Sequence, residues 1–157
     1  MSGSRFGLPG WPGARAVIFD ADGVVVDSEP LWELAQEEFL RRRGLAWRRS
    51  ETKHLLTGAA PEEAVRTMQR IYDLPGDAGA LSRERLAIVK GLYLARGVAY
   101  MPGFLDFFRF VQGRAATAVA TSMNGELLDV VDRALGLRAL FSGRVYTIAD
   151  AGGRGKP

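Results

Sequence analysis

The stretch RAVIFDADG at residues 15–23 decides the fold of this chain. A short apolar run that ends in acidic residues and glycine favours a strand buried on both faces of a parallel sheet. Asp22-Gly23 then breaks the strand. Asp20 and Asp22 lie two residues apart on an extended segment, so their side chains point the same way. At the carboxyl end of a parallel strand they face the crevice in which α/β folds bind ligands.

Two carboxylates this close repel each other, so a divalent cation or a shared proton is expected between them. One carboxylate can attack phosphorus as a nucleophile while the other transfers protons. An Asp-Gly turn after a strand is the simpler interpretation of an isolated motif of this kind. The pattern in the rest of the chain favours the catalytic interpretation.

Helical patterns and two more strand-like segments follow this first strand. Between the strands, helices are predicted from about residue 28 to 43, from residue 61 to about 72 and over about 79–95, so residues 30–96 are nearly all helix. Next come a helix at 104–111, a strand at 115–121, a helix from Asn124 to Gly136 and a strand at 145–148. This order predicts an α/β domain that carries a helical insert.

Composition excludes several classes of protein. The chain has 157 residues, no Cys and one His, which excludes disulfides, zinc ribbons and thiol catalysis. Its net charge of +3 is too small to indicate nucleic-acid binding. The cluster Arg41, Arg42, Arg43, Arg48 and Arg49 is interpreted as a solvated helix end, with a phosphate-binding patch as the alternative.

No apolar run has membrane-spanning length, and residues 1–14 make a poor signal peptide. We therefore expect a flexible N-terminal tail over residues 1–14, no membrane partner, no nucleic-acid partner and a cytoplasmic location.

Three motifs make the sequence similar to one family. Residues 19–29, FDADGVVVDSE, resemble the first motif of the haloacid dehalogenase (HAD) superfamily of phosphohydrolases, closest to the branch of β-phosphoglucomutase and small sugar-phosphate phosphatases. Residues 118–122, AVATS, resemble the second motif, and Gly155-Lys156-Pro157 resembles the third. Met101-Pro102-Gly103 matches the usual return from the cap into the core. The order of the motifs is that of the family.

This resemblance implies a role for each matching residue. Asp20 would be the nucleophile that forms an aspartyl-phosphate, and Asp22 would be the general acid and base. Thr121, Ser122, Lys156 and Gly23 would bind the phosphoryl group. Mg²⁺ would lie on the carboxylate of Asp20 and the backbone carbonyl of Asp22, with hard oxygen ligands and waters.

The resemblance also implies a domain plan. Residues 15–29 and 97–157 would form a Rossmann-like three-layer core with a parallel sheet, and residues 30–96 an α-helical cap. The family places a fourth, acidic motif on a further strand after the Lys, and nothing follows Pro157. We therefore expect the C-terminal part of the core to be missing, a weakened metal site, an exposed sheet edge and impaired activity. The acid nearest the third motif, Asp150, is interpreted as a loop acid.

The predicted function is Mg²⁺-dependent hydrolysis of a small phosphorylated metabolite, such as a sugar phosphate. A phosphomutase of the β-phosphoglucomutase type is one alternative, because it shares all the residues above. A non-catalytic fragment that binds a phosphorylated ligand or a partner is another.

Overall fold

The computed structural model describes residues 10, 13–150 and 152. The chain divides into two compact units, one of residues 1–28 and 98–157 and the other of residues 29–97. Most of the predicted N-terminal tail, together with Gly155, Lys156 and Pro157, lies outside the described residues. Among the described residues, no helix combines the length and the apolar character needed to cross a membrane.

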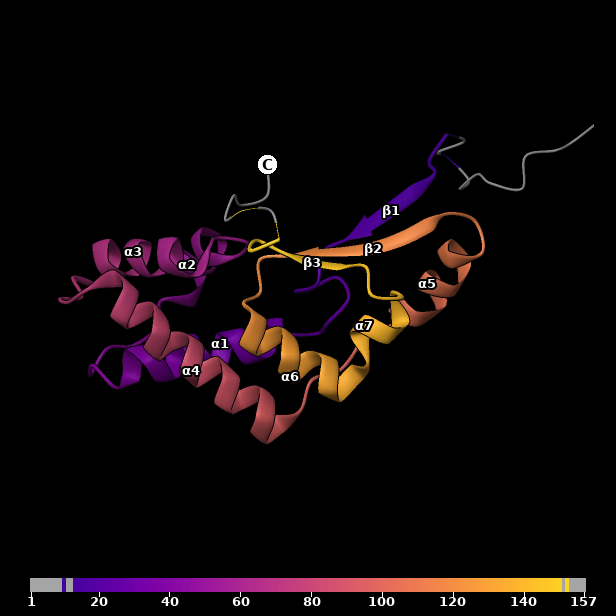
Figure 1. Ribbon diagram of the computed structural model, residues 1–157. Helices are drawn as coiled ribbons and strands as arrows, with labels where there is room; N and C mark the ends of the chain where they lie inside the picture. The colour runs from indigo at the N-terminus through magenta and orange to yellow at the C-terminus, as the bar shows by residue number, and fades with distance from the viewer. Residues whose placement is uncertain (1–9, 11–12, 151, 153–157) are drawn as a thin grey trace, which may run out of the picture. The chain divides into compact units, whose positions relative to one another are not determined.

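The first unit is built on a parallel sheet of three strands, as Figure 1 shows. The strands are β1 (Ala16–Phe19), β2 (Ala116–Thr121) and β3 (Val145–Thr147), in the order β1-β2-β3. Phe19 is paired with Val119, and Thr121 with Thr147. The predicted α/β class and parallel sheet are therefore confirmed.

Helices α5 (Phe104–Gln112), α6 (Gly125–Leu135) and α7 (Leu137–Leu140) lie on one side of this sheet (Figure 1). An aromatic cluster fills the space between them and the strands. The rings of Phe108 and Phe141 are 4.8 Å apart in a T-shaped arrangement, and Phe19 packs against Phe104 at 5.6 Å. All four side chains are buried, so they form the centre of this unit's core.

Strand β1 is an edge strand, and the expectation that it is buried on both faces is wrong. Phe19 points into the core, but Ile18 is 68% exposed. The cause is the face on which Ile18 lies. Helices α5, α6 and α7 lie on the face of the sheet to which Phe19 points, whereas Ile18 points to the other face, as does Tyr146 of β3, which is 51% exposed. An apolar run therefore indicated the strand correctly but not its burial, which depends on whether both faces of the sheet are covered.

The second unit is a group of four helices: α1 (Glu29–Arg41), α2 (Arg49–Leu56), α3 (Pro61–Tyr72) and α4 (Ala78–Arg96). Helix α4 packs against both α1 and α3. Pro61 opens α3 at its first turn, and Asp77 caps α4 by accepting a hydrogen bond from the amide of Ala80 at 2.8 Å. Phe39 of α1 and Met68 of α3 are fully buried.

Helix α2 was not predicted as a separate element, and the arginine cluster is not one helix end. Arg41 ends α1, while Arg49 begins α2 without a side-chain cap. A cation in the first turn of a helix is disfavoured by the helix dipole. The carboxylate of Glu33 in α1 offsets this, because it pairs with Arg49 at 2.6 Å. A tertiary contact thus supports a helix whose local sequence signals are weak.

Candidate functional site

The carboxyl ends of the three strands bring polar residues to one edge of the sheet. Phe19 ends β1 opposite Val119, so Asp20 follows beside the last residues of β2. Thr121 ends β2 and is paired with Thr147, the last residue of β3. Open α/β sheets bind ligands at the carboxyl ends of their strands. This edge is therefore the candidate functional site.

The chain turns sharply directly after Asp20. The carbonyl oxygen of Ala21 accepts hydrogen bonds from the amides of residues 24, 25 and 26 at 3.4, 3.0 and 2.8 Å. Gly23 has a φ of +71°, in the left-handed region that other residues rarely adopt. The turn requires glycine at this position, and it keeps exposed Asp20 and half-buried Asp22 close to the end of β1.

The carboxylate of Asp22 is held by a serine of the same segment. The hydroxyl of Ser28 donates a hydrogen bond to Oδ1 of Asp22 at 2.7 Å, and Ser28 is fully buried. The amide of Ser28 donates to the carbonyl of Val26, and the amide of Asp27 donates to that of Ala99, each at 2.9 Å. Ser28 is thus a well-anchored residue that orients the Asp22 carboxyl group.

This role of Ser28 is not predicted from the sequence, in which residue 28 is expected to begin a helix because Ser commonly precedes a first helical turn. The sequence feature that could have indicated this contact is a serine six positions after Asp22, in a segment that reverses direction at Gly23. Such spacing becomes a contact only once the path of the turn is known.

The second strand end contributes Thr121 and Ser122. Thr121 is buried, and its Oγ1 accepts a hydrogen bond from the amide of Met123 at 3.0 Å. Asn124 caps α6, as predicted, by accepting from the amide of Leu127 at 2.9 Å. A hydroxyl that accepts one bond keeps its own hydrogen to donate. Thr121 therefore suits the recognition of an oxyanion at this edge.

The carboxylate of Asp150 accepts hydrogen bonds within the turn that follows β3. Its Oδ2 accepts from the amide of Thr147 at 2.7 Å and from the hydroxyl of Thr147 at 2.8 Å. These bonds, first the one from the amide, lower the pKa of Asp150. The contacts agree with its interpretation as a loop acid.

The oxygen donors at the first strand end fit Mg²⁺. This ion prefers carboxylate and carbonyl oxygens, and it usually keeps several waters beside one or two carboxylates. Asp20 and Asp22 offer such oxygens on one turn. Within the part of the chain that the structure describes, no three or more His, Cys, Asp or Glu residues gather into a group that could hold a metal ion. The predicted phosphate ligand Lys156 lies outside that part.

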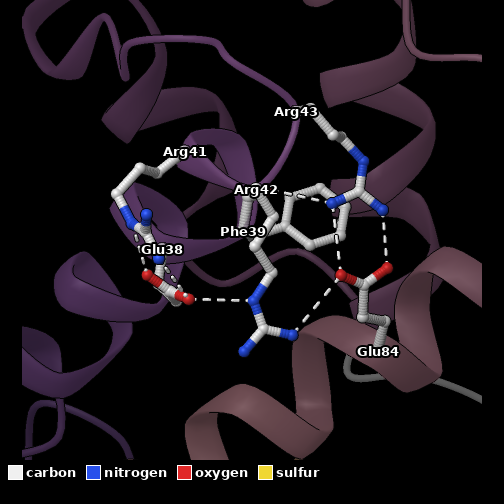
Figure 2. Close-up of polar contacts among 6 residues, drawn as sticks. All are labelled: Glu38, Phe39, Arg41, Arg42, Arg43 and Glu84. Atoms are coloured by element: carbon white, nitrogen blue, oxygen red, sulfur yellow. Dashed lines mark hydrogen bonds and ion pairs between the residues drawn. The ribbon is translucent and has the colours of Figure 1, made fainter.

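The arginines of the cluster in the helical unit pair with glutamates, as Figure 2 shows for three of its members. Arg41 and Arg42 both pair with Glu38, at 2.8 and 2.9 Å. Arg43 lies over the ring of Phe39 at 4.0 Å and pairs with Glu84 of α4 at 2.6 Å. Each of these three arginines thus has a carboxylate partner within the protein, two of them sharing Glu38, which weakens the alternative interpretation as a phosphate-binding patch.

The other two members of the cluster have partners as well. Arg48 lies over the ring of Tyr72 at 4.9 Å and pairs with Glu51 at 3.2 Å. Arg49 donates to both carboxylate oxygens of Glu33. The hydrogen bonds from Arg49, and then those from Lys53, lower the pKa of Glu33 to about 2.

Comparison with known proteins bears on what this site does. A family model described as haloacid dehalogenase-like hydrolase matches residues 14–157. The fructose-1-phosphate phosphatase YqaB of Escherichia coli (strain K12) is 28% identical to this chain over 125 residues, which are 80% of this chain and 65% of that protein. The chain therefore spans slightly less than two thirds of this relative's length.

Solved structures show the same fold. CbbY from Rhodobacter sphaeroides, in complex with phosphate, is 26% identical with a TM-score of 0.64, over 85% of this chain and 62% of that one. The HAD-hydrolase YfnB from Bacillus subtilis, bound to magnesium, is 16% identical with a TM-score of 0.64, over 88% of this chain and 67% of that one.

Proposed function

Because the chain belongs to the haloacid dehalogenase-like hydrolases, we propose that it hydrolyses the phosphate ester of a small phosphorylated metabolite through an aspartyl-phosphate. One observation carries the proposal. Asp20 follows the end of β1 directly and Thr121 ends the neighbouring strand, with Asp22 on the turn between β1 and Ser28. Nucleophile, proton-transfer group and oxyanion donor thus come from one edge of one sheet.

In the proposed first step, a carboxylate oxygen of Asp20 attacks phosphorus. A bond forms between that oxygen and phosphorus, and the bond from phosphorus to the ester oxygen breaks. Asp22 in its protonated form gives its proton to the leaving oxygen, which departs as an alcohol. Phosphoryl transfer depends mainly on such in-line positioning and on charge stabilisation.

In the second step, the ionised Asp22 takes a proton from a water molecule. The water oxygen attacks phosphorus, the bond to the Asp20 oxygen breaks, and inorganic phosphate leaves. Both carboxyl groups return to their starting states. The bond from Ser28 keeps Asp22 oriented in both steps.

The transferred phosphoryl group needs donors for its oxygens. We assign this role to the hydroxyl of Thr121, to Ser122 and to the ammonium group of Lys156. The amide of Gly23, which was expected to share this role, donates to the carbonyl of Val26 at 2.9 Å. The carboxylate of Asp20 and the backbone carbonyl of Asp22 would hold Mg²⁺, which this superfamily generally uses and which when bound neutralises charge on phosphate.

The substrate class rests on the relatives. One relative is a fructose-1-phosphate phosphatase, so a sugar phosphate is the substrate we propose. We assign residues 29–97 to a cap that selects the substrate, since they form a compact helical unit inserted into the chain of the first unit.

The proposal is tested by the hydrolysis of p-nitrophenyl phosphate and fructose 1-phosphate, with and without added Mg²⁺. Asp20→Asn should lower kcat by about a thousandfold or more, because the amide is a poor nucleophile. Acid quenching during turnover should trap phosphate on the unsubstituted chain and not on this variant.

Asp150→Asn is the matched control, since it removes a carboxylate near the same sheet edge that serves only a turn. Its kcat should stay within about threefold of the unsubstituted chain. Turnover that survives in folded Asp20→Asn, or that is lost equally in Asp150→Asn, contradicts the assignment.

A further inference from the structure

An open cavity lies at the carboxyl end of α1, and the helical unit alone forms it. Its volume is about 570 Å³, within the range of about 300–1,000 Å³ that is common for small-molecule sites. The residues that line it come from the end of α1 and from the loop that leads to α2: Glu37, Arg41, Gly44, Leu45, Ala46 and Trp47. The proposed hydrolysis uses none of these residues.

Hydrogen bonds fix the loop that forms the apolar wall of this cavity. The amide of Leu45 donates to the carbonyl of Leu40 at 3.0 Å, across Gly44, whose φ of +70° lets the chain turn at the end of the helix. The indole Nε1 of Trp47 donates to Oγ1 of Thr52, a buried residue, at 2.9 Å. The wall is therefore held in place before any ligand arrives.

Two opposite charges line the cavity without pairing with each other. Glu37 and Arg41 are four residues apart on α1, a spacing that puts Cβ atoms about 5–6 Å apart and commonly allows an ion pair. Arg41 instead donates to Glu38, from Nε at 2.8 Å and from Nη2 at 3.1 Å (Figure 2). Among the described residues, the exposed carboxylate of Glu37 accepts no hydrogen bond, and Arg49 acts on it only through its charge. A carboxylate and the Nη1 group of a guanidinium are thus open to a ligand at one cavity.

We propose that this cavity binds a free α-amino acid with an aromatic or branched apolar side chain. In the complex, the carboxylate of Glu37 accepts hydrogen bonds from the ammonium group, and Nη1 of Arg41 donates to the carboxylate group. The apolar side chain lies against Leu45 and Trp47. A zwitterion suits this pair better than a singly charged ligand, because each of its charged groups meets a side chain of opposite sign. The site gives the helical unit a ligand beyond the proposed function.

Isothermal titration calorimetry on the full chain tests the site with four probes. L-phenylalanine has all three features, 3-phenylpropionate lacks the ammonium group, 2-phenylethylamine lacks the carboxylate and L-alanine lacks the ring. L-phenylalanine should bind at least about tenfold more tightly than each of the others, because each of them loses one of the three contacts. None of the probes carries a phosphate ester, so the result does not depend on hydrolysis.

Two substitutions assign the charged contacts. Glu37→Gln and Arg41→Gln should each weaken the binding of L-phenylalanine about tenfold. In Glu37→Gln, L-phenylalanine should also lose its advantage over 3-phenylpropionate, since the ammonium group no longer meets a carboxylate. Glu63→Gln and Arg66→Gln are the matched controls, because they make the same changes of charge at exposed positions of α3 and should leave the affinity unchanged.

Several results overturn the proposal. These are equal affinity for L-phenylalanine in Glu37→Gln and Glu63→Gln, binding of any other probe as tightly as L-phenylalanine, and no binding of L-phenylalanine at millimolar concentration. Circular dichroism checks that the variants fold. Arg41→Gln also removes the pair with Glu38, whereas Glu37→Gln breaks no hydrogen bond within the described residues, so the result for Glu37→Gln decides the matter if Arg41→Gln does not fold.

Discussion

The sheet edge and the helical unit use polar side chains over different distances along the chain. At the edge, Ser28 and Asp22 are six residues apart, and Thr147 and Asp150 are three apart. The helical unit has local pairs too, such as Arg41 with Glu38, but there Arg43 also reaches Glu84 over 41 residues and Arg85 reaches Gln36 over 49. At the site, long-range strand pairing brings the strand ends together and short turns then fix the side chains, whereas in the helical unit side chains themselves join distant helices.

This difference has a physical cause. A strand end and its turn place a side chain through backbone geometry, which a few neighbouring residues determine. A charge pair between helices forms only after both helices have packed, and it then adds a small energy to a fold that apolar burial already stabilises. Substitutions in the apolar core, at the site and in the charge network should therefore differ in size and in what they affect.

The largest effect should come from the aromatic core beneath the sheet. Phe108→Ala removes a buried ring that packs against Phe141 and Phe19, and it should lower the free energy of unfolding by about 3–5 kcal/mol. Urea denaturation measures this. The adjacent Phe107, which is 51% exposed, provides the control, and Phe107→Ala should cost less than about 1 kcal/mol. Equal losses would mean that the core lies elsewhere.

A smaller effect, on catalysis, should follow loss of the hydroxyl that holds Asp22. If Asp22 protonates the leaving group, Ser28→Ala should lower kcat/KM for fructose 1-phosphate about tenfold, because its alkoxide needs a proton. The value for p-nitrophenyl phosphate should fall less than about threefold, since p-nitrophenolate leaves readily.

Two variants separate this positioning role from a general loss of stability. Ser28→Thr keeps the hydroxyl and should restore the rate with fructose 1-phosphate. Ser82→Ala removes a buried serine of α4 and should leave the ratio of the two rates unchanged. Equal losses for both esters in Ser28→Ala argue against the assignment.

The smallest effect should come from the charge network of α1 and α2. The pKa of Glu33 is lowered from 4.5 to about 2, so the folded state favours the ionised carboxylate. Its contribution to stability is therefore fully present above about pH 4.5 and is lost as the pH falls through about 2. Because the pair lies near the surface, we expect less than about 1 kcal/mol.

Thermal unfolding at several pH values between 6 and 2, roughly the range over which carboxylates titrate, measures this contribution. The unsubstituted chain should lose its advantage over Glu33→Gln as the pH falls. Glu62→Gln is a control in an exposed pair within one helix. A constant difference between the chain and Glu33→Gln over this range would contradict the role assigned to Glu33.

Much of the fold could be predicted from local signals. Apolar runs indicated the three strands, and Pro61, Asn124 and Gly136 marked helix ends that the structure confirms. Helix α2 escaped prediction because it starts with a cation and without a side-chain cap. The exposure of Ile18 escaped it as well, because an apolar run carries no information on which face of the sheet the helices cover.

The sequence by itself determined the elements, their order and the residues offered at the strand ends. Backbone preference and apolar periodicity act over a few residues, so they can be recognised without the structure. Only the tertiary structure decided that one face of β1 is exposed, that Ser28 holds Asp22 and that Arg43 has a carboxylate partner where Arg85 has an amide. These outcomes depend on which distant segments pack together, and that is set by the sum of many weak contacts.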